Sequence, residues 1–85
     1  MGKDLTQTRL FNSDELKREI IRSNLVTISN ALKERGYNPV SQIAGYLISN
    51  DPAYISSHKG ARSLIQQMDR NELIEELVQF YLESK

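Results

Sequence analysis

Residues 31–62 read ALKERGYNPVSQIAGYLISNDPAYISSHKGAR, and they contain the signals that end one helix and begin the next. Gly36 stands where a helix commonly ends in a left-handed residue, a conformation that glycine adopts at little steric cost. Asn38 and Pro39 then provide the N-cap and the first residue of a second helix. Pro52 ends that helix and is expected to open one short helical turn. The stretch therefore predicts two helices joined by a tight corner.

The second of these helices carries a dense apolar stripe. Gly45 lies inside it at a cost of about 1 kcal/mol relative to alanine, which predicts a close packing contact at that position. The tyrosines of the stretch lie near glycine or proline at helix ends, and we expect them to anchor the core or a dimer interface. The stripe consists of Val40, Ile43, Ala44, Leu47 and Ile48, and the tyrosines are Tyr37, Tyr46 and Tyr54.

Upstream of this stretch, apolar residues recur at helical spacing with charged residues between them. Asn12 is a good N-cap, and Glu15 lies three positions on, where it completes a capping box. The first helix is expected to end near Arg35, directly before the corner. Its apolar residues are Leu16, Ile20, Leu25, Ile28, Ala31 and Leu32.

Downstream, two further helices are expected. The first covers residues 57–68 and should bury Ala61, Leu64, Ile65 and Met68. The last begins after Asp69, which has capping-box spacing to Glu72. Glu75 and Glu76 are expected on its solvated outer face. Its apolar residues form two adjacent rows, Leu73, Leu77 and Tyr81 beside Ile74, Val78 and Leu82.

The complete pattern predicts an all-α fold of four main helices plus a short helical turn. We expect one helical domain over residues 12–85, preceded by a flexible N-terminal arm over residues 1–11, which show no helical periodicity. A chain of 85 residues buries only about two-thirds of its unfolded surface, so its core is thin. A homodimer would bury more, and we expect one.

Composition excludes several classes of function. Eleven basic and eleven acidic residues give a net charge of zero, which argues against a protein that coats nucleic acid or an anionic membrane. The absence of cysteine excludes disulfides, thiol catalysis and thiolate metal sites. Neither a signal peptide nor a membrane-spanning run is recognisable, so a soluble cytoplasmic protein is expected.

The residues do not form a recognisable catalytic or cofactor site. His58 is the single histidine, and no nucleophile and acid complete a catalytic set around it. The four glycines are dispersed and form no phosphate-binding loop. Glu72, Glu75 and Glu76 are better explained as acids that complement a helix dipole. We therefore expect no enzyme activity, no cofactor and no metal.

A small helix-turn-helix DNA-binding regulator is the main alternative. Residues 38–68 contain two short helices separated by a break, loosely as in that motif. Lys59, Arg62 and Arg70 would then contact phosphates or bases. Three cations among acidic residues make a weak electrostatic footprint, so binding to nucleic acid is not expected.

The N-terminal arm offers two threonines, Thr6 and Thr8, to a modifying enzyme. A kinase requires an accessible, extended backbone, and chain termini often provide one. A phosphate adds nearly two negative charges, which could dock onto cations such as Arg9, Lys59 or Arg62. Taken alone this signal is weak, because most terminal threonines are never modified.

Several unusual peptides in this chain resemble those of the IreB/ReoM family of Gram-positive bacteria. The residues that carry the resemblance are GYNP at 36–39, QIAGY at 42–46, DPAYI at 51–55 and the run ELIEELV with the following YL at 72–82. They occur in order at matching distances, and the resemblance covers residues 31–82 closely and the first helix loosely.

The resemblance implies a helical homodimer with a flexible N-terminal tail. Family members are substrates of membrane-anchored Ser/Thr kinases with extracellular PASTA repeats, opposed by a cognate phosphatase. They regulate cell-wall synthesis, and in some lineages they act through the proteolytic machinery that degrades the first enzyme of peptidoglycan-precursor synthesis. The family's phosphorylated threonine precedes an aromatic residue, so Thr8, followed by Phe11, matches best and Thr6 is second.

Overall fold

The computed structural model describes residues 13–84, and every regular element among them is helical. The all-α fold with four main helices is therefore confirmed, and the predicted arm over residues 1–11 lies outside the described residues, as does Asn12. In chain order the elements are α2 (Ser13–Glu34), α3 (Pro39–Ser49), the 3-10 turns η1 (Pro52–Tyr54) and η2 (His58–Gly60), α4 (Ala61–Gln66) and α5 (Arg70–Glu83).

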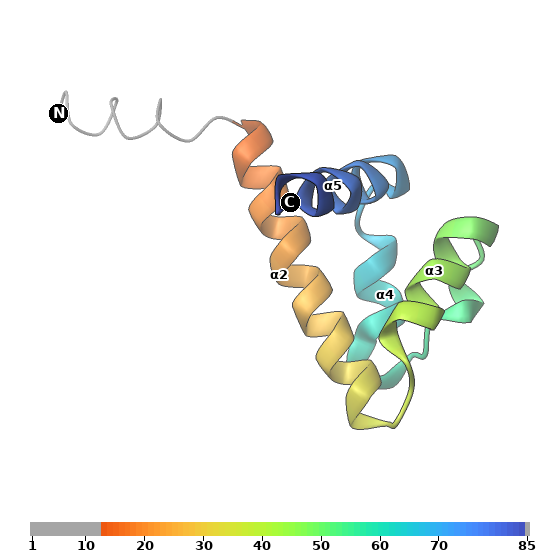
Figure 1. Ribbon diagram of the computed structural model, residues 1–85. Helices are drawn as coiled ribbons and strands as arrows, with labels where there is room; N and C mark the ends of the chain where they lie inside the picture. Colours follow the sequence, from red (N-terminus) through yellow and green to blue (C-terminus); the bar gives the residue numbers. More distant parts are fainter. Residues whose placement is uncertain (1–12, 85) are drawn as a thin grey trace, which may run out of the picture.

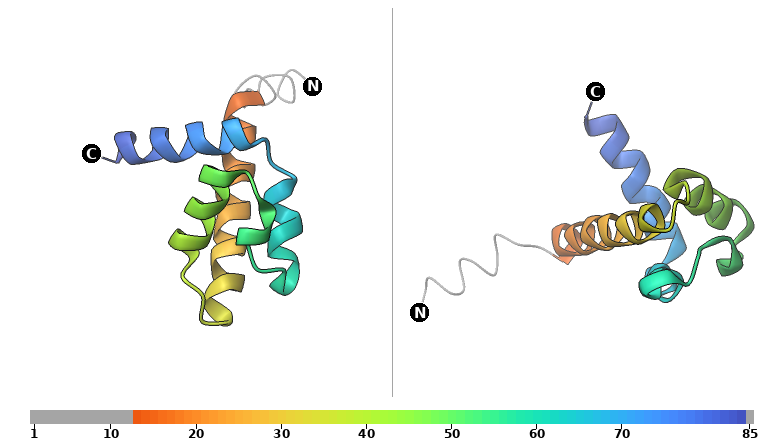
Figure 2. Two further views of the ribbon diagram at one scale, coloured as in Figure 1. Left: turned by 90° about the vertical axis from the view of Figure 1, so that its right-hand side faces the viewer. Right: turned by 90° about the horizontal axis from the view of Figure 1, so that it is seen from below.

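The long helix α2 is the element on which the others pack. It contacts α3, α4, η2 and α5. Figure 1 shows α3 and α4 along the C-terminal half of α2, whereas α5 crosses its N-terminal half. In Figure 2 the C-terminal end of α5 projects away from the other helices. The two halves of α2 therefore have different neighbours.

One hydrophobic core lies between α2, α4 and the segments that follow α3. Its largest fully buried side chains come from α2, the residue directly after η1, α4 and the first turn of α5. Burial of such side chains contributes roughly 1.5–3 kcal/mol each, which is the main term that holds so small a domain together. These side chains are Ile28, Leu32, Ile55, Ile65 and Leu73.

The predicted helix ends are confirmed at the corner and before α5. Gly36 has a φ of +80°, the left-handed conformation expected after a helix. The Asn38 side chain accepts a hydrogen bond from the Ser41 amide at 3.2 Å, and Asp69 caps α5 by accepting from the amide of Asn71. Each cap satisfies an amide at a helix start that would otherwise have no partner.

The helix expected over residues 57–68 is interrupted. Lys59 and Gly60 have φ values of +51° and +75°, and two left-handed residues cannot continue a right-handed helix. The segment is therefore split into η2 and the six-residue α4. The expected burial of Ala61, Ile65 and Met68 is nevertheless confirmed.

Several apolar rows are more exposed than their periodicity indicates. On α3, Val40 and Ile48 are 77% and 85% exposed, while Tyr46 is buried in their place. Leu73 is the one member of the two α5 rows that is fully buried, and the exposed apolar members lie from Leu77 onward. The other large exposed apolar side chains on α2 and α5 are Leu16, Ile20, Val26, Leu77, Val78, Phe80, Tyr81 and Leu82.

The packing contact expected at Gly45 is confirmed. The ring of Tyr54, from the turn η1, lies against the backbone of α3 at this glycine. A Cβ atom at position 45 would lie 2.7 Å from Cδ1 of Tyr54, closer than real Cβ contacts allow. Glycine therefore lets η1 fold back on α3, which accounts for a residue that otherwise weakens the helix.

We expect Gly45→Ala to lower the free energy of unfolding by roughly 1 kcal/mol, because the clash with Tyr54 exceeds the gain in helix propensity. Urea denaturation measures the change. In a Tyr54→Ala background the same substitution should be neutral or stabilising by up to about 1 kcal/mol. An equal loss in both backgrounds would show that the ring is not the cause.

Candidate functional site

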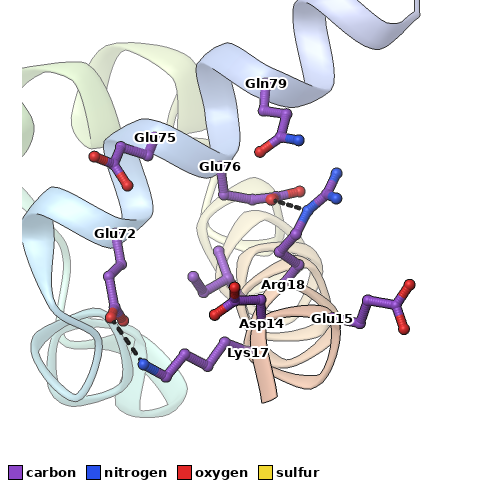
Figure 3. Close-up of a pocket in the computed structure, with 9 residues that line it drawn as sticks. Asp14, Glu15, Lys17, Arg18, Glu72, Glu75, Glu76 and Gln79 are labelled. Carbon is purple, nitrogen blue, oxygen red and sulfur yellow. Dashed lines mark hydrogen bonds and ion pairs between the residues drawn. The ribbon is translucent and has the colours of Figure 1, made fainter. Parts of the chain in front are cut away.

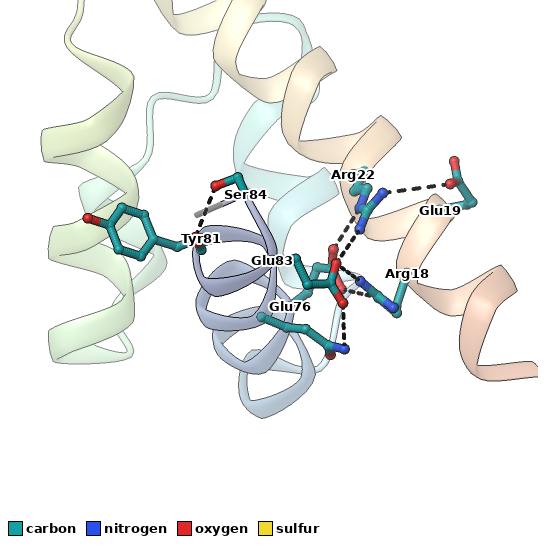
Figure 4. Close-up of polar contacts among 8 residues, drawn as sticks. Arg18, Glu19, Arg22, Glu76, Tyr81, Glu83 and Ser84 are labelled. Carbon is teal, nitrogen blue, oxygen red and sulfur yellow. Dashed lines mark hydrogen bonds and ion pairs between the residues drawn. The ribbon is translucent and has the colours of Figure 1, made fainter.

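A cluster of four charged side chains joins α2 to α5. Arg18 and Arg22 lie one turn apart on α2, so both guanidinium groups face the same way. Glu76 and Glu83 lie two turns apart on α5 and face them. Figure 4 shows the two arginines directed at both carboxylates.

The arginines share Glu76 symmetrically. Nε of Arg18 donates to Oε1 of Glu76 at 2.7 Å, and Nε of Arg22 donates to Oε2 at the same distance. Oε1 of Glu83 lies 3.0 Å from Nη2 of Arg18 and 3.9 Å from Nη2 of Arg22, while Nη1 of Arg22 lies 3.9 Å from Oε2 of Glu19 on its own helix. The cluster thus has an inner pair on Glu76 and an outer pair on Glu83.

Glu76 is a buried carboxylate, with 4% of its surface exposed. Burial by itself would raise the pKa of this carboxyl, but the hydrogen bonds from Arg22 and Arg18 outweigh burial and hold the pKa below its ordinary value of 4.5. The same bonds, with those to Glu83, raise the pKa of Arg18. Glu76 and Arg18 therefore remain charged at neutral pH.

The burial of Glu76 corrects its expected place on the solvated face of the last helix. Glu76 follows Leu73 by three positions, so it lies on the same face of α5 as the one fully buried leucine of that helix. A carboxylate on a buried face requires cations opposite it. Arg18 and Arg22, spaced four residues apart on the first helix, were the signal that sequence reasoning missed.

Shallow hollows lie on either side of this cluster. Figure 3 shows the larger one, about 490 Å³, between the first turns of α2 and the middle of α5. Most of the residues that line this hollow are charged. Across it, Nζ of Lys17 lies 3.2 Å from Oε2 of Glu72. The second hollow, about 420 Å³, lies beside Glu83. Open hollows lined by charged side chains suit polar or charged groups of a partner better than a small apolar substrate.

Phe80 completes the contact on the α5 side. The guanidinium carbon of Arg22 lies 5.2 Å from the centre of the Phe80 ring, within the range of a cation–π interaction. Phe80 itself is about half exposed. Arg22 therefore links the ion cluster to the exposed apolar surface of α5.

The cations predicted to contact phosphates or a partner are engaged within the chain. Nζ of Lys59 lies 3.0 Å from Glu34. Nε of Arg62 and Nη1 of Arg70 each donate to a backbone carbonyl at 2.8 Å, those of Ile55 and Leu47 respectively. The three cations hold three different segments in place. Thr6, Thr8 and Arg9 lie outside the described residues.

His58 forms a second, smaller cluster at the opposite end of α2. Its Nε2 lies 2.7 Å from Oε1 of Glu34, and Lys59 contacts the other oxygen of the same carboxylate. These bonds, that of His58 first, lower the pKa of Glu34. The pair fixes η2 against the end of α2, where Lys59 has its left-handed conformation.

Residues 13–84 contain neither a metal-binding cluster nor a membrane-spanning helix. No group of three or more histidine or acidic side chains is arranged there to hold a metal ion. Within the same residues, no helix is both long and apolar enough to cross a membrane.

Comparison with known proteins identifies the family. The sequence matches the family model described as IreB regulatory phosphoprotein over residues 6–83. The chain belongs to the IreB family. It is also 44% identical over 80 residues to a UPF0297 protein of Ruminiclostridium cellulolyticum, an alignment that covers 94% of this chain and 91% of that relative. This IreB family member is therefore a regulatory protein, and the resemblance carried by residues 31–82 is confirmed.

We expect Glu76→Gln to lower the free energy of unfolding by roughly 2 kcal/mol. This is less than the roughly 3–5 kcal/mol typical when one partner of a buried ion pair is removed. The reason is that the side chains of Arg18 and Arg22 are 28% and 37% exposed and can regain water. Urea denaturation at neutral pH measures the loss. Glu75→Gln, an exposed neighbour, should change stability by less than about 0.5 kcal/mol.

The ion pairs of Glu76 with the two arginines predict that stability depends on pH. Because the pKa of Glu76 is lower in the folded protein, its ion pairs stabilise the fold above the ordinary carboxyl range. That contribution is lost as the pH falls below 4.5 toward the folded-state pKa. The stability difference between the wild type and Glu76→Gln should therefore shrink with acidification. A difference that stays constant down to pH values well below 4.5 would contradict this assignment.

Proposed function

We propose that this protein is a kinase substrate whose phosphorylation on Thr8, with Thr6 as the second site, controls cell-wall synthesis. The observation that carries the proposal is the family match, which is described as a regulatory phosphoprotein and begins at residue 6. The match therefore includes both threonines. The third threonine of the chain, Thr27, lies within α2, where its hydroxyl donates to the carbonyl of Ser23.

The protein acts by binding other proteins and without catalysis of its own. Its partners are a PASTA-type Ser/Thr kinase, a cognate phosphatase and the regulatory or proteolytic machinery of cell-wall synthesis. Support comes from the surface, which offers open charged hollows and exposed apolar side chains. Surfaces of this kind are typical of protein interaction sites.

The protein forms a homodimer through the second half of α5. Within residues 77–82 five large apolar side chains are exposed, a density that a soluble monomer rarely tolerates. Packing of α5 against its counterpart in a second chain would cover them, and a two-fold axis makes such a patch self-complementary. These side chains are Leu77, Val78, Phe80, Tyr81 and Leu82.

Incubation of the protein with ATP and a PASTA-type kinase domain tests the phosphorylation. Intact mass with fragmentation should locate one phosphate on Thr8, or one each on Thr8 and Thr6. Thr8→Ala should remove the main site, whereas Thr27→Ala, within α2, should label like the wild type. Unchanged labelling of Thr8→Ala would rule out the assignment, provided that the kinase phosphorylates a control substrate.

Light scattering coupled to size exclusion tests the dimer. We expect twice the 9.8 kDa of one chain for the wild type and a shift to the monomer for Leu82→Glu, which buries a charge in the interface. Val40→Glu is the matched control, because Val40 is also apolar and exposed but lies on α3. A monomeric wild type, or equal effects of both substitutions, would contradict a dimer through α5.

A further inference from the structure

The length of the N-terminal segment limits which cations its phosphate can reach. Thr8 precedes the start of α2 at Ser13 by five residues, which span at most about 18 Å when extended. Along α2 the rise is about 1.5 Å per residue, so Glu34 lies roughly 31 Å from Ser13. Lys59, which binds Glu34, is therefore beyond the reach of Thr8 in the same chain.

Cations on the first half of α2 are within reach. Lys17, Arg18 and Arg22 lie roughly 6, 8 and 14 Å along the helix from Ser13. Lys17 presents a single compact charge, whereas a guanidinium group offers several donors in a planar fork that matches phosphate oxygens. Two such groups one turn apart make Arg18 and Arg22 the favoured partners.

The arginines have donors that can change partner. Both Nε atoms donate to Glu76. Because Glu76 is buried, an anion that approaches from solvent cannot take its place. Nη2 of Arg18 bonds Glu83, whose side chain is 50% exposed and which is the last residue of α5. The outer nitrogens of Arg22 make looser ion pairs, each at 3.9 Å, with Glu83 and with Glu19. The 420 Å³ hollow opens beside these outer nitrogens, and its lining residues are Glu15, Leu16, Arg18, Glu19, Arg22 and Glu83.

Charge decides between Glu83 and a phosphate. A phosphothreonine has close to two negative charges and three acceptor oxygens, whereas Glu83 has one charge and two oxygens. Glu15 and Glu19 also line the hollow and repel an anion, so free phosphate should bind poorly. A phosphate on a short tether has an effective concentration in the millimolar range, which offsets that repulsion.

We propose that Arg18 and Arg22 bind the phosphate of Thr8 from the same chain in exchange for Glu83. The exchange releases the last turn of α5, the part of that helix that the outer ion pair holds to α2. The inner pair on Glu76 stays in place. This inference rests on the proposed function, because it assigns a receptor for the phosphate to a segment that the kinase modifies.

The experiment places phosphothreonine at position 8 during protein synthesis, so that it does not depend on a kinase. Hydrogen exchange by mass spectrometry then compares the modified and unmodified proteins over residues 77–84. Loss of an exposed ion pair should speed exchange there roughly two- to fivefold. A failure of kinase labelling would thus count against the proposed function and leave this comparison intact.

Substitution of the competing acid is the decisive control. In Glu83→Gln, exchange over residues 77–84 should already be fast, and phosphothreonine should add no further increase. Glu75→Gln, an exposed acid on α5 outside the arginine cluster, should respond to phosphothreonine like the wild type. Arg18→Gln should also abolish the increase in exchange that phosphothreonine causes. If Arg18→Gln does not fold, Glu83→Gln still tests the inference.

Three outcomes would overturn the inference. The first is unchanged exchange over residues 77–84 when phosphothreonine is present at position 8. The second is an equal increase in the wild type and in Glu83→Gln, which would show that Glu83 is not displaced. The third is an increase produced by inorganic phosphate alone at millimolar concentration, which would show that the tethered segment is not required.

Discussion

The structure depends on the burial of one face of α2. A chain of 85 residues has apolar surface for one core only, and the fully buried Ile28 and Leu32 lie at its centre. Helices α3 and α4 and the turn η2 each contact the same long helix. Their positions follow from this constraint, because each short helix buries part of its apolar surface against α2, with the turn η1 packed on both α3 and α4.

The two halves of α2 differ in the contacts that hold their neighbours. Along the C-terminal half the buried contacts are apolar, through residues such as Ile28 and Leu32. The N-terminal half holds α5 through the buried side chains of Ile21 and Leu73 and, in addition, through the ion pairs of Arg18 and Arg22 with Glu76, which depend on charge. A new charge nearby can weaken these ion pairs, whereas it has little effect on the buried apolar contacts. The exposed apolar side chains of α5 lie on the helix that these ion pairs hold to α2. Under the proposed function, partner binding and phosphorylation would therefore act on the same helix.

The candidate site shows the limit of reasoning from spacing alone. Thr6 and Thr8 stay predictions from the family resemblance, because they lie outside the described residues. Arg62 and Arg70 were predicted as contact residues from their charge, and the structure shows their guanidinium groups bonded to the carbonyls of Ile55 and Leu47, which spacing could not indicate. Periodicity also assigned Glu76 to solvent, because it records which residues share a face but not what lies opposite that face.

The sequence by itself determined the all-α class and the helix ends at Gly36, Asn38 and Asp69, since these depend on local backbone chemistry. It also indicated a close contact at Gly45, although only the fold shows that the partner is the ring of Tyr54 from η1. Only the tertiary structure decided that Glu76 is buried between two arginines and that the second half of α5 is exposed. Those features depend on where α5 crosses α2. That crossing is set by the packing of the whole core, which no single segment encodes.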